Sequence, residues 1–265
     1  MCESGRDGPA APDAPVLSLE GVSVRFRVPH ERIASLKEYA VRLARRRVQF
    51  RDFWALRDVS LSVNRGEVFG IVGRNGAGKS TLLRVVARVL RPTIGRVWVQ
   101  GRVAPLLDLG GAFHPELTGR ENVFLNGTLL GFSRREIDRN LDRIVSFAEL
   151  GEFIDAPLRT YSAGMIARLG FAIASDVRPD VLLVDEILAV GDAEFQAKSA
   201  ARIREFKEQG TAILMASHSL STVTEMCARA VWIDHGEIRA VGPAREVARA
   251  YSGREGPERS GVGRT

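Results

Sequence analysis

Short apolar runs alternate with helical patterns along most of the chain. Val68–Val72, Val181–Val184 and Ala212–Ala216 are apolar runs of strand length, and a segment with helical periodicity follows each of them. Those segments are Thr81–Leu90, Ala193–Lys207 and Leu220–Cys227. Such alternation is typical of a mainly parallel sheet flanked by helices, so the pattern predicts an α/β fold.

Two parts of the chain depart from this alternation. A second group of segments predicts antiparallel strands beside the core, namely Val16–Val28, Val59–Val63, Arg96–Val99 and Val103–Leu107. Between Gly110 and Arg178 the pattern is helical, which predicts an inserted helical subdomain over about 110–178. We expect one domain over 16–251, with flexible, glycine-rich tails at 1–15 and 252–265.

The composition of the chain mainly excludes several classes of protein. With 45% hydrophobic and 26% charged residues, the chain is neither wholly disordered nor a miniature stapled scaffold. No run approaches the roughly 20 apolar residues that cross a bilayer, and the N-terminus lacks a signal-peptide pattern, so we expect a soluble, cytosolic protein. Cys2 and Cys227 form neither a disulfide framework nor a metal pattern. The net charge of +6 would suit an anionic partner, but arginine far outnumbers lysine, so this charge carries little weight.

A glycine-rich segment follows the first apolar run. It has the spacing of a phosphate-binding loop and consists of Gly73, Arg74, Asn75, Gly76, Ala77, Gly78, Lys79, Ser80 and Thr81. Glycines allow successive backbone N–H groups to turn toward an anion at the positive end of a helix. Lys79 can reach the β- and γ-phosphates of a nucleotide, and the Ser80 hydroxyl can bind Mg²⁺. The alternative is a chance glycine-rich turn, but the flanking strand and helix favour a phosphate site.

Polar residues follow the other two apolar runs. Asp185 and Glu186 end the run that starts at Val181, and His218 comes shortly after Ala216. Parallel strands end at one edge of a sheet, where the ligands of open α/β folds bind. We expect Asp185 to complete the Mg²⁺ shell, Glu186 to act as general base on the attacking water, and a neutral His218 to contact the γ-phosphate. Solvated loop acids and an incidental histidine are the alternatives.

The segment Tyr161-Ser162-Ala163-Gly164-Met165 resembles the signature motif of ATP-binding cassette (ABC) proteins. The resemblance implies a P-loop NTPase fold of the ABC ATPase type from Val16 to about Tyr251, with ATP as the nucleotide. It also implies that Ser162, Ala163, Gly164 and Met165 act on ATP held by a second subunit, since a helix N-terminus attracts anions. A simple helix N-cap is the alternative for Ser162.

Further positions follow from the same resemblance. Asp192 falls on the loop that crosses the dimer interface in this family. Phe26 is the first candidate for the aromatic residue that stacks on adenine, and Trp54 is the second, with an ordinary buried aromatic as the alternative for both. Many cassettes carry a glutamine in the loop before the helical subdomain, but the corresponding position here is close to Leu109, so we assign no residue to that role.

Three stretches resemble the ATPases of polysaccharide and teichoic acid exporters. They are Leu106–Asn122, Tyr161–Met165 and Glu186–Gln196. This resemblance implies an ATPase subunit that powers export of a lipid-linked chain of the O-antigen, capsule, galactan or teichoic acid type. Because the chain shows no span of its own, a separate permease is the implied partner.

The region 28–53 is a basic insertion between two predicted strands. Ile33, Leu36, Ala40 and Leu43 recur with a helical period, and basic residues cover other faces: Arg32, Lys37, Arg42, Arg45, Arg46 and Arg47. A basic amphipathic helix can lie on an anionic membrane surface. The exporters that the chain resembles have a helix here, near the membrane entrance for the lipid-linked substrate. A solvated surface helix is the alternative.

These features predict a homodimer that holds two ATP molecules between its subunits, each bound by one phosphate loop and the opposite signature. Glu186, Lys79 and His218 are the expected catalytic residues. We expect a peripheral subunit on the cytoplasmic face of a bacterial inner membrane, with no nucleic acid partner. The alternatives are an importer or drug-efflux ATPase, and a soluble cassette protein acting on nucleic acid or ribosomes, which usually has two cassettes or long coiled coils.

Overall fold

The computed structural model describes residues 15–29, 50–107, 111, 113–176, 178–185 and 192–254. One sheet is antiparallel, has the order β2-β1-β4, and consists of β1 (Pro15–Pro29), β2 (Phe50–Asn64) and β4 (Ile94–Val99). The other has the order β5-β6-β7-β3-β8-β9 and consists of β3 (Val68–Val72), β5 (Val103–Leu106), β6 (Val181–Asp185), β7 (Ala212–Ala216), β8 (Arg229–Asp234) and β9 (Glu237–Pro243). In this second sheet all neighbouring strands pair in parallel except β8 and β9.

The helices follow the strands much as the periodicity indicates. They are α2 (Lys79–Val86), α3 (Gly119–Leu129), α4 (Arg134–Ala148), α5 (Ala163–Asp176), α6 (Ala193–Glu208), α7 (Leu220–Met226) and α8 (Ala244–Arg254), with a 3₁₀ turn at Leu158–Thr160. α3 and α4 each begin at a capping box, in which Thr118 or Ser133 exchanges hydrogen bonds with the glutamate three residues later. This local chemistry explains why both helices start where they do.

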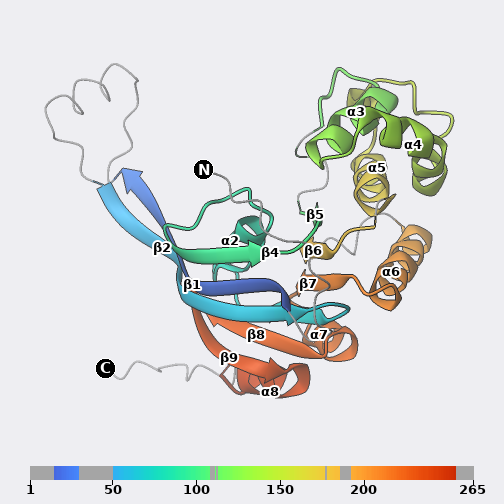
Figure 1. The fold of residues 1–265 in the computed structure, drawn as a ribbon. Helices are drawn as coiled ribbons and strands as arrows, with labels where there is room; N and C mark the ends of the chain where they lie inside the picture. The colour runs from blue at the N-terminus through green and yellow to red at the C-terminus, as the bar shows by residue number, and fades with distance from the viewer. Residues whose placement is uncertain are drawn as a thin grey trace, which may run out of the picture.

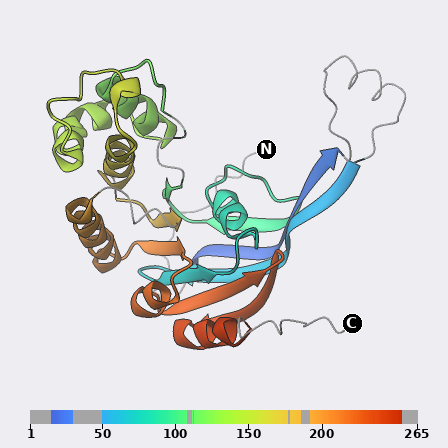
Figure 2. The same cartoon turned by 180° about the vertical axis from the view of Figure 1, so that it is seen from behind.

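The elements form three regions. The helices α3, α4 and α5 stand together beyond the β5 end of the six-stranded sheet, and the three-stranded sheet with α2 lies on the other side (Figure 1). The view from behind shows α8 lying against β8 and β9 (Figure 2). The prediction of a mainly parallel sheet with an antiparallel β subdomain and an inserted helical subdomain is confirmed. Within the described ranges, each helix is too short or too polar to cross a bilayer.

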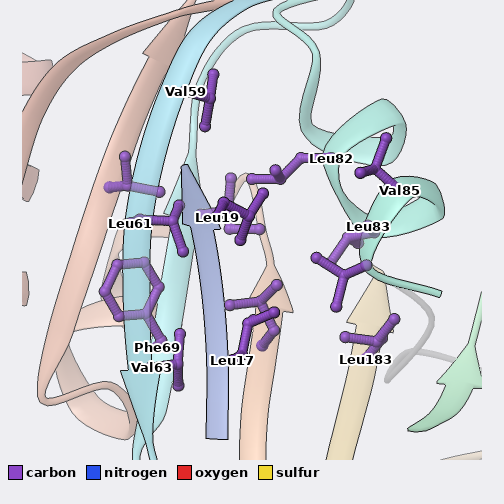
Figure 3. Packing of buried hydrophobic residues seen from close by; sticks show 14 of the residues in the cluster. Leu17, Leu19, Val59, Leu61, Val63, Phe69, Leu82, Leu83, Val85 and Leu183 are labelled. Atoms are coloured by element: carbon purple, nitrogen blue, oxygen red, sulfur yellow. The ribbon is translucent and has the colours of Figure 1, made fainter. Parts of the chain in front are cut away.

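The core holds α2 between the two sheets. Leu82 and Leu83 of this helix are fully buried in one cluster with Leu17 and Leu19 of β1 and Leu183 of β6, and Figure 3 shows these side chains filling the space between the layers. Burial of one leucine side chain contributes about 1.5–3 kcal/mol. Because α2 follows the glycine-rich loop directly, this packing also fixes the loop relative to both sheets.

One strand lies in a different sheet from the one predicted. The prediction of an antiparallel strand at Val103–Leu107 is wrong, because β5 pairs in parallel with β6. The chain leaves the antiparallel sheet through Gly101, which has a positive φ of 81°. The Arg102 N–H then donates to Asp180 Oδ2 over 2.8 Å, and the Asp180 N–H donates back to the Arg102 carbonyl over 2.9 Å. These bonds between residues far apart in sequence align β5 with β6.

Candidate nucleotide site

Three parallel strands bring the predicted phosphate chemistry to one edge of the sheet. The glycine-rich loop follows β3, Asp185 ends β6, and His218 follows β7. They surround a cavity of about 500 Å³. Its lining consists of Phe26, Phe53, Ala55, Asn75, Gly76, Gly78, Lys79, Ser80, Thr81, Asp185 and His218. Residues expected from the sequence therefore gather around one space of the size typical for small-molecule sites.

The loop has a backbone that only glycine accommodates easily. Gly78 has a φ of 113°, and a Cβ atom there would lie 2.7 Å from the Ala55 carbonyl oxygen. The turn after β8 supports the loop from the other side, because the Gly236 N–H donates to the Ala77 carbonyl over 2.9 Å. Gly236 also accepts from the Arg57 N–H over 2.8 Å, so β2, the loop and the β8–β9 turn form one bonded unit.

Lys79 occupies the centre of the loop. Its Nζ donates to the Gly73 carbonyl over 2.6 Å and to the Arg74 carbonyl over 3.2 Å. Burial lowers the pKa of Lys79, and the nearby Asp185 carboxylate partly offsets this effect. An ammonium that donates to carbonyl oxygens can exchange those weak acceptors for phosphate oxygens, which form stronger, charge-assisted bonds.

Ser80 and Asp185 offer oxygen ligands for a cation. The Ser80 hydroxyl donates to Asp185 Oδ2 over 3.1 Å across the gap between α2 and β6. A hydroxyl and a carboxylate are ligands that Mg²⁺ prefers, and this ion usually binds through one or two protein oxygens together with phosphates and water. The residues therefore fit the predicted magnesium site.

His218 lines the cavity beside these groups. Burial is the main cause that lowers its pKa, the positive charge of Lys79 adds to the effect, and Asp185 opposes it. The imidazole is therefore neutral at pH 7, where one ring nitrogen can donate a hydrogen bond and the other can accept one.

The aromatic side of the cavity holds one residue that the sequence analysis missed. Phe26 lines the cavity and is 39% exposed, and its cross-strand partner Phe53 also lines it and is 54% exposed. Trp54, the second candidate, is half-buried, lines a neighbouring pocket and has the Arg25 guanidinium 5.5 Å from its ring centre. The sequence held only a partial signal: Phe53 and Trp54 are neighbours on one strand and face opposite sides, so one of them could line the cavity, but the pairing with β1 decides which.

The predicted signature lies at the start of α5, apart from the cavity lining. Ala163, Gly164 and Met165 form the first turn of this helix, and Ser162 precedes it. The Met165 N–H donates to Ser162 Oγ over 3.2 Å, so Ser162 is an N-cap. A serine hydroxyl that accepts this bond keeps its own proton for another acceptor.

Asp192 caps the following helix. Its Oδ1 accepts from the Phe195 N–H over 3.0 Å, and its other oxygen pairs with Arg168 of α5. Several other predictions fall outside the described residues: Glu186, the position of the absent glutamine near Leu109, and residues 30–49 of the basic insertion.

The chain matches the ABC transporter family over residues 56–189. It is 47% identical to the O-antigen export system ATP-binding protein RfbB of Klebsiella pneumoniae, and the alignment covers 89% of this chain and 97% of that protein. It is 46% identical to RfbB of Myxococcus xanthus, covering 92% of this chain and 56% of that protein. It is 43% identical to the teichoic acids export ATP-binding protein TagH of Enterococcus faecalis, covering 75% of this chain and 44% of that protein.

Solved structures show the same fold. The dimeric ATP-binding cassette MJ0796 bound to ADP and phosphate in a post-hydrolysis state superposes with a TM-score of 0.68 at 20% identity, over 86% of this chain and 99% of that one. An ATP-binding subunit of an ABC transporter superposes with a TM-score of 0.69 at 22% identity, over 91% of this chain and 95% of that one. Together with the sequence matches, this fold shows that the chain belongs to the ABC transporter family, as an ATPase domain of the ATP-binding cassette type.

Proposed function

We propose that the chain is the ATP-hydrolysing subunit of an exporter that moves a lipid-linked polysaccharide across the cytoplasmic membrane through a separate permease. The observation that carries the export assignment is the 47% identity to the O-antigen export protein of Klebsiella pneumoniae, because it extends over nearly the full length of both chains. Relatives named for O-antigen and for teichoic acids support the same substrate class, a glycan or related polymer.

The phosphate side of the cavity binds ATP in this proposal. Lys79 releases the Gly73 and Arg74 carbonyls and binds the β- and γ-phosphates, and the loop N–H groups and the start of α2 surround them. Ser80 and Asp185 hold Mg²⁺, which neutralises charge on the phosphates when it is bound. The neutral His218 contacts the γ-phosphate, and Phe26 and Phe53 offer apolar faces to the adenine ring.

Glu186 is the proposed general base. It follows Asp185 directly in the chain, and Asp185 lines the cavity at the end of β6. In this proposal the Glu186 carboxylate accepts a proton from water as the water oxygen bonds to the γ-phosphorus. The bond from the γ-phosphorus to the β–γ bridging oxygen breaks, and ADP leaves. Lys79 stabilises the negative charge that develops on the phosphate oxygens.

The second half of each site comes from another copy of the chain. Ser162, Ala163, Gly164 and Met165 act on ATP of the partner subunit, where the Ser162 hydroxyl and the first N–H groups of α5 donate to the γ-phosphate. Asp192 lies on the loop between the subunits. The dimeric form of the cassette MJ0796 supports this arrangement. ATP then joins the subunits, and its hydrolysis separates them.

In this proposal the subunit is peripheral and lies on the cytoplasmic face of the membrane. The basic and apolar residues of the insertion 28–53 suit contact with anionic lipid close to the entrance for the lipid-linked substrate. Closure and reopening of the dimer move the helices of the permease, which supplies the path across the bilayer.

The first test measures ATP hydrolysis by the full chain together with its permease in lipid nanodiscs. Addition of lipid-linked glycan is expected to raise the rate several-fold, because transport and hydrolysis are coupled. The lipid carrier without glycan is the matched ligand control, and Lys79→Ala is the enzyme blank. A rate that no lipid-linked glycan changes would contradict the export assignment, and equal rates for wild type and Lys79→Ala would contradict the site.

A further inference from the structure

A two-residue turn joins β8 to β9 directly behind the glycine-rich loop. Asp234 pairs with Glu237, so His235 and Gly236 alone form the turn, and their φ angles are both positive, 51° and 80°. Two successive positive φ angles are typical of a type I′ hairpin turn, whose twist matches that of the strands it joins. The turn therefore has one favoured orientation relative to β8 and β9.

The tip of the glycine-rich loop has open space on two sides. Gly76 lines the nucleotide cavity, and it also lines a second cavity of about 430 Å³ whose walls come from β2 and the β8–β9 turn. A Cβ atom at Gly76 would lie more than 4 Å from every described atom outside residues 75–77. Contacts at the tip therefore do not hold the loop in place, and its flanks must do so.

Both flanks of the loop rest on the β8–β9 hairpin. At the first flank, Gly73 lies so close to the end of β8 that a Cβ atom there would clash with the Ile233 carbonyl oxygen. At the other flank, the Gly236 N–H donates to the Ala77 carbonyl over 2.9 Å. One hairpin thus supports the loop on either side of its unsupported tip.

The contact at Gly236 leaves no room for a side chain. A Cβ atom at Gly236 would lie 2.7 Å from the Ala55 carbonyl oxygen of β2, and a Cβ atom at Gly78 would lie at the same distance from the same oxygen. The Arg57 N–H of β2 also donates to the Gly236 carbonyl over 2.8 Å. Strand, loop and turn therefore meet backbone to backbone, which glycine permits and other residues do not.

We propose that Gly236 is a positioning residue for the phosphate loop, because its close contact with Ala77 and Ala55 sets the direction of the loop N–H groups. This inference rests on the proposed function, in which those groups bind the phosphates of ATP. Gly236 is not among the residues that line the nucleotide cavity, so it acts through the loop. A side chain at Gly236 would push the turn away from β2 and displace the Ala77 carbonyl, which shifts the N–H groups between Gly73 and Lys79.

Gly210 offers a matched control. Its φ of 84° is close to that of Gly236, but a Cβ atom there would lie more than 4 Å from every described atom outside residues 209–211. Gly210→Ala therefore places a side chain at a similar positive φ, with similar backbone strain, and causes no clash. A difference between the two variants reports the contact of Gly236 with the loop and β2.

The experiment compares wild type, Gly236→Ala and Gly210→Ala as full chains. Calorimetric titration measures the affinity for ATP and for inorganic tripolyphosphate, both with Mg²⁺, and thermal unfolding measures stability. We expect Gly236→Ala to weaken the binding of both ligands by the same factor, on the order of 10- to 100-fold, because a misplacement of about 1 Å has effects of that size. Gly210→Ala is expected to lose stability and to keep both affinities within about twofold, because distant sites act nearly independently.

A measurement on wild type covers the case in which Gly236→Ala does not fold. Amide hydrogen exchange, resolved by NMR, is followed with and without tripolyphosphate. Exchange of the Gly236 N–H should slow by up to about 100-fold at a ligand concentration 100 times the Kd, because the ligand fixes the loop that carries its acceptor. The Gly210 N–H, which donates to the Lys207 carbonyl over 3.0 Å, should keep its rate.

Three results would each overturn the inference and leave the ATPase assignment standing. The first is equal tripolyphosphate affinity for Gly236→Ala and Gly210→Ala, and the second is a loss of affinity for ATP alone, which would place the effect at the base. The third is unchanged exchange of the Gly236 N–H when tripolyphosphate binds to wild type. Failure of wild type to bind either ATP or tripolyphosphate would instead overturn the proposed function, and the inference with it.

Discussion

Two phenylalanines form an apolar wall in an otherwise polar cavity. Phe26 and Phe53 are paired residues on β1 and β2, and both rings keep a large exposed fraction. Apolar surface left in water is unfavourable, so core packing does not explain this pair. A flat heteroaromatic base covers such surface from one side, which makes adenine a suitable ligand for the wall.

Phe53→Ala is expected to weaken ATP binding roughly 5- to 150-fold, since loss of one base–aromatic stack costs about 1–3 kcal/mol. Calorimetric titration with ATP and with inorganic tripolyphosphate checks this, because tripolyphosphate has no base and its affinity should not change. Trp54→Ala is the neighbouring control, with wild-type ATP affinity expected. An equal loss for both ligands would mean that Phe53 supports the phosphate loop instead of the base.

At the scale of elements, ion pairs join the ends of α4, α5 and α6 in a cluster that we call the three-helix junction, made of Glu149, Arg168, Asp192 and Lys198. Because these contacts are between charged groups, the stability of the junction depends on pH. Hydrogen bonding from Lys198 is the main cause that lowers the pKa of Glu149 from its ordinary 4.5, with Arg168 adding to the effect and Asp192 opposing it. The Phe195 N–H is the main cause that lowers the pKa of Asp192 from 3.8, again with help from Arg168. The folded state therefore binds fewer protons than the unfolded state in acid.

The junction should thus lose stability as the pH falls below about 4.5, because both carboxylates become protonated at lower pH in the folded chain than in the unfolded one. Urea unfolding measured between pH 7 and pH 3 gives the free energy of unfolding at each pH. Glu149→Gln should reduce the acid slope of that curve, because it removes one of the two groups. Glu205→Gln, which removes an exposed acid paired with Arg202 outside the junction, shows how much slope any such acid contributes. Equal slopes for wild type and Glu149→Gln would contradict this prediction.

At the scale of the whole molecule, the gathering of the phosphate loop, Asp185 and His218 could be predicted because one rule suffices: parallel strands end at one edge of their sheet. Phe53 was missed because its place depends on the register of β1 against β2, which the sequence of either strand does not reveal. The strand β5 was assigned to the wrong sheet because bonds between Arg102 and Asp180 decide its pairing. The Arg168–Asp192 pair likewise depends on how α5 packs against α6. Motifs and the sheet edge where they gather could therefore be predicted from the sequence, whereas individual side-chain contacts and strand pairings between distant segments could not.

The proposed dimer predicts that a variant without the general base accumulates as a dimer with ATP bound. Glu186→Gln keeps the shape of the side chain and removes the base, so ATP still binds but hydrolysis falls at least about 100-fold, the lower end of what a general base contributes. If ATP joins two subunits and only hydrolysis separates them, the variant accumulates as an ATP-bound dimer, which size-exclusion chromatography with light scattering detects. Glu194→Gln, an exposed acid in the first turn of α6, should hydrolyse ATP like wild type and remain in exchange between monomer and dimer. Normal turnover by Glu186→Gln would contradict the role of Glu186 as general base. A variant that does not hydrolyse ATP but stays monomeric in its presence would contradict the ATP-bound dimer.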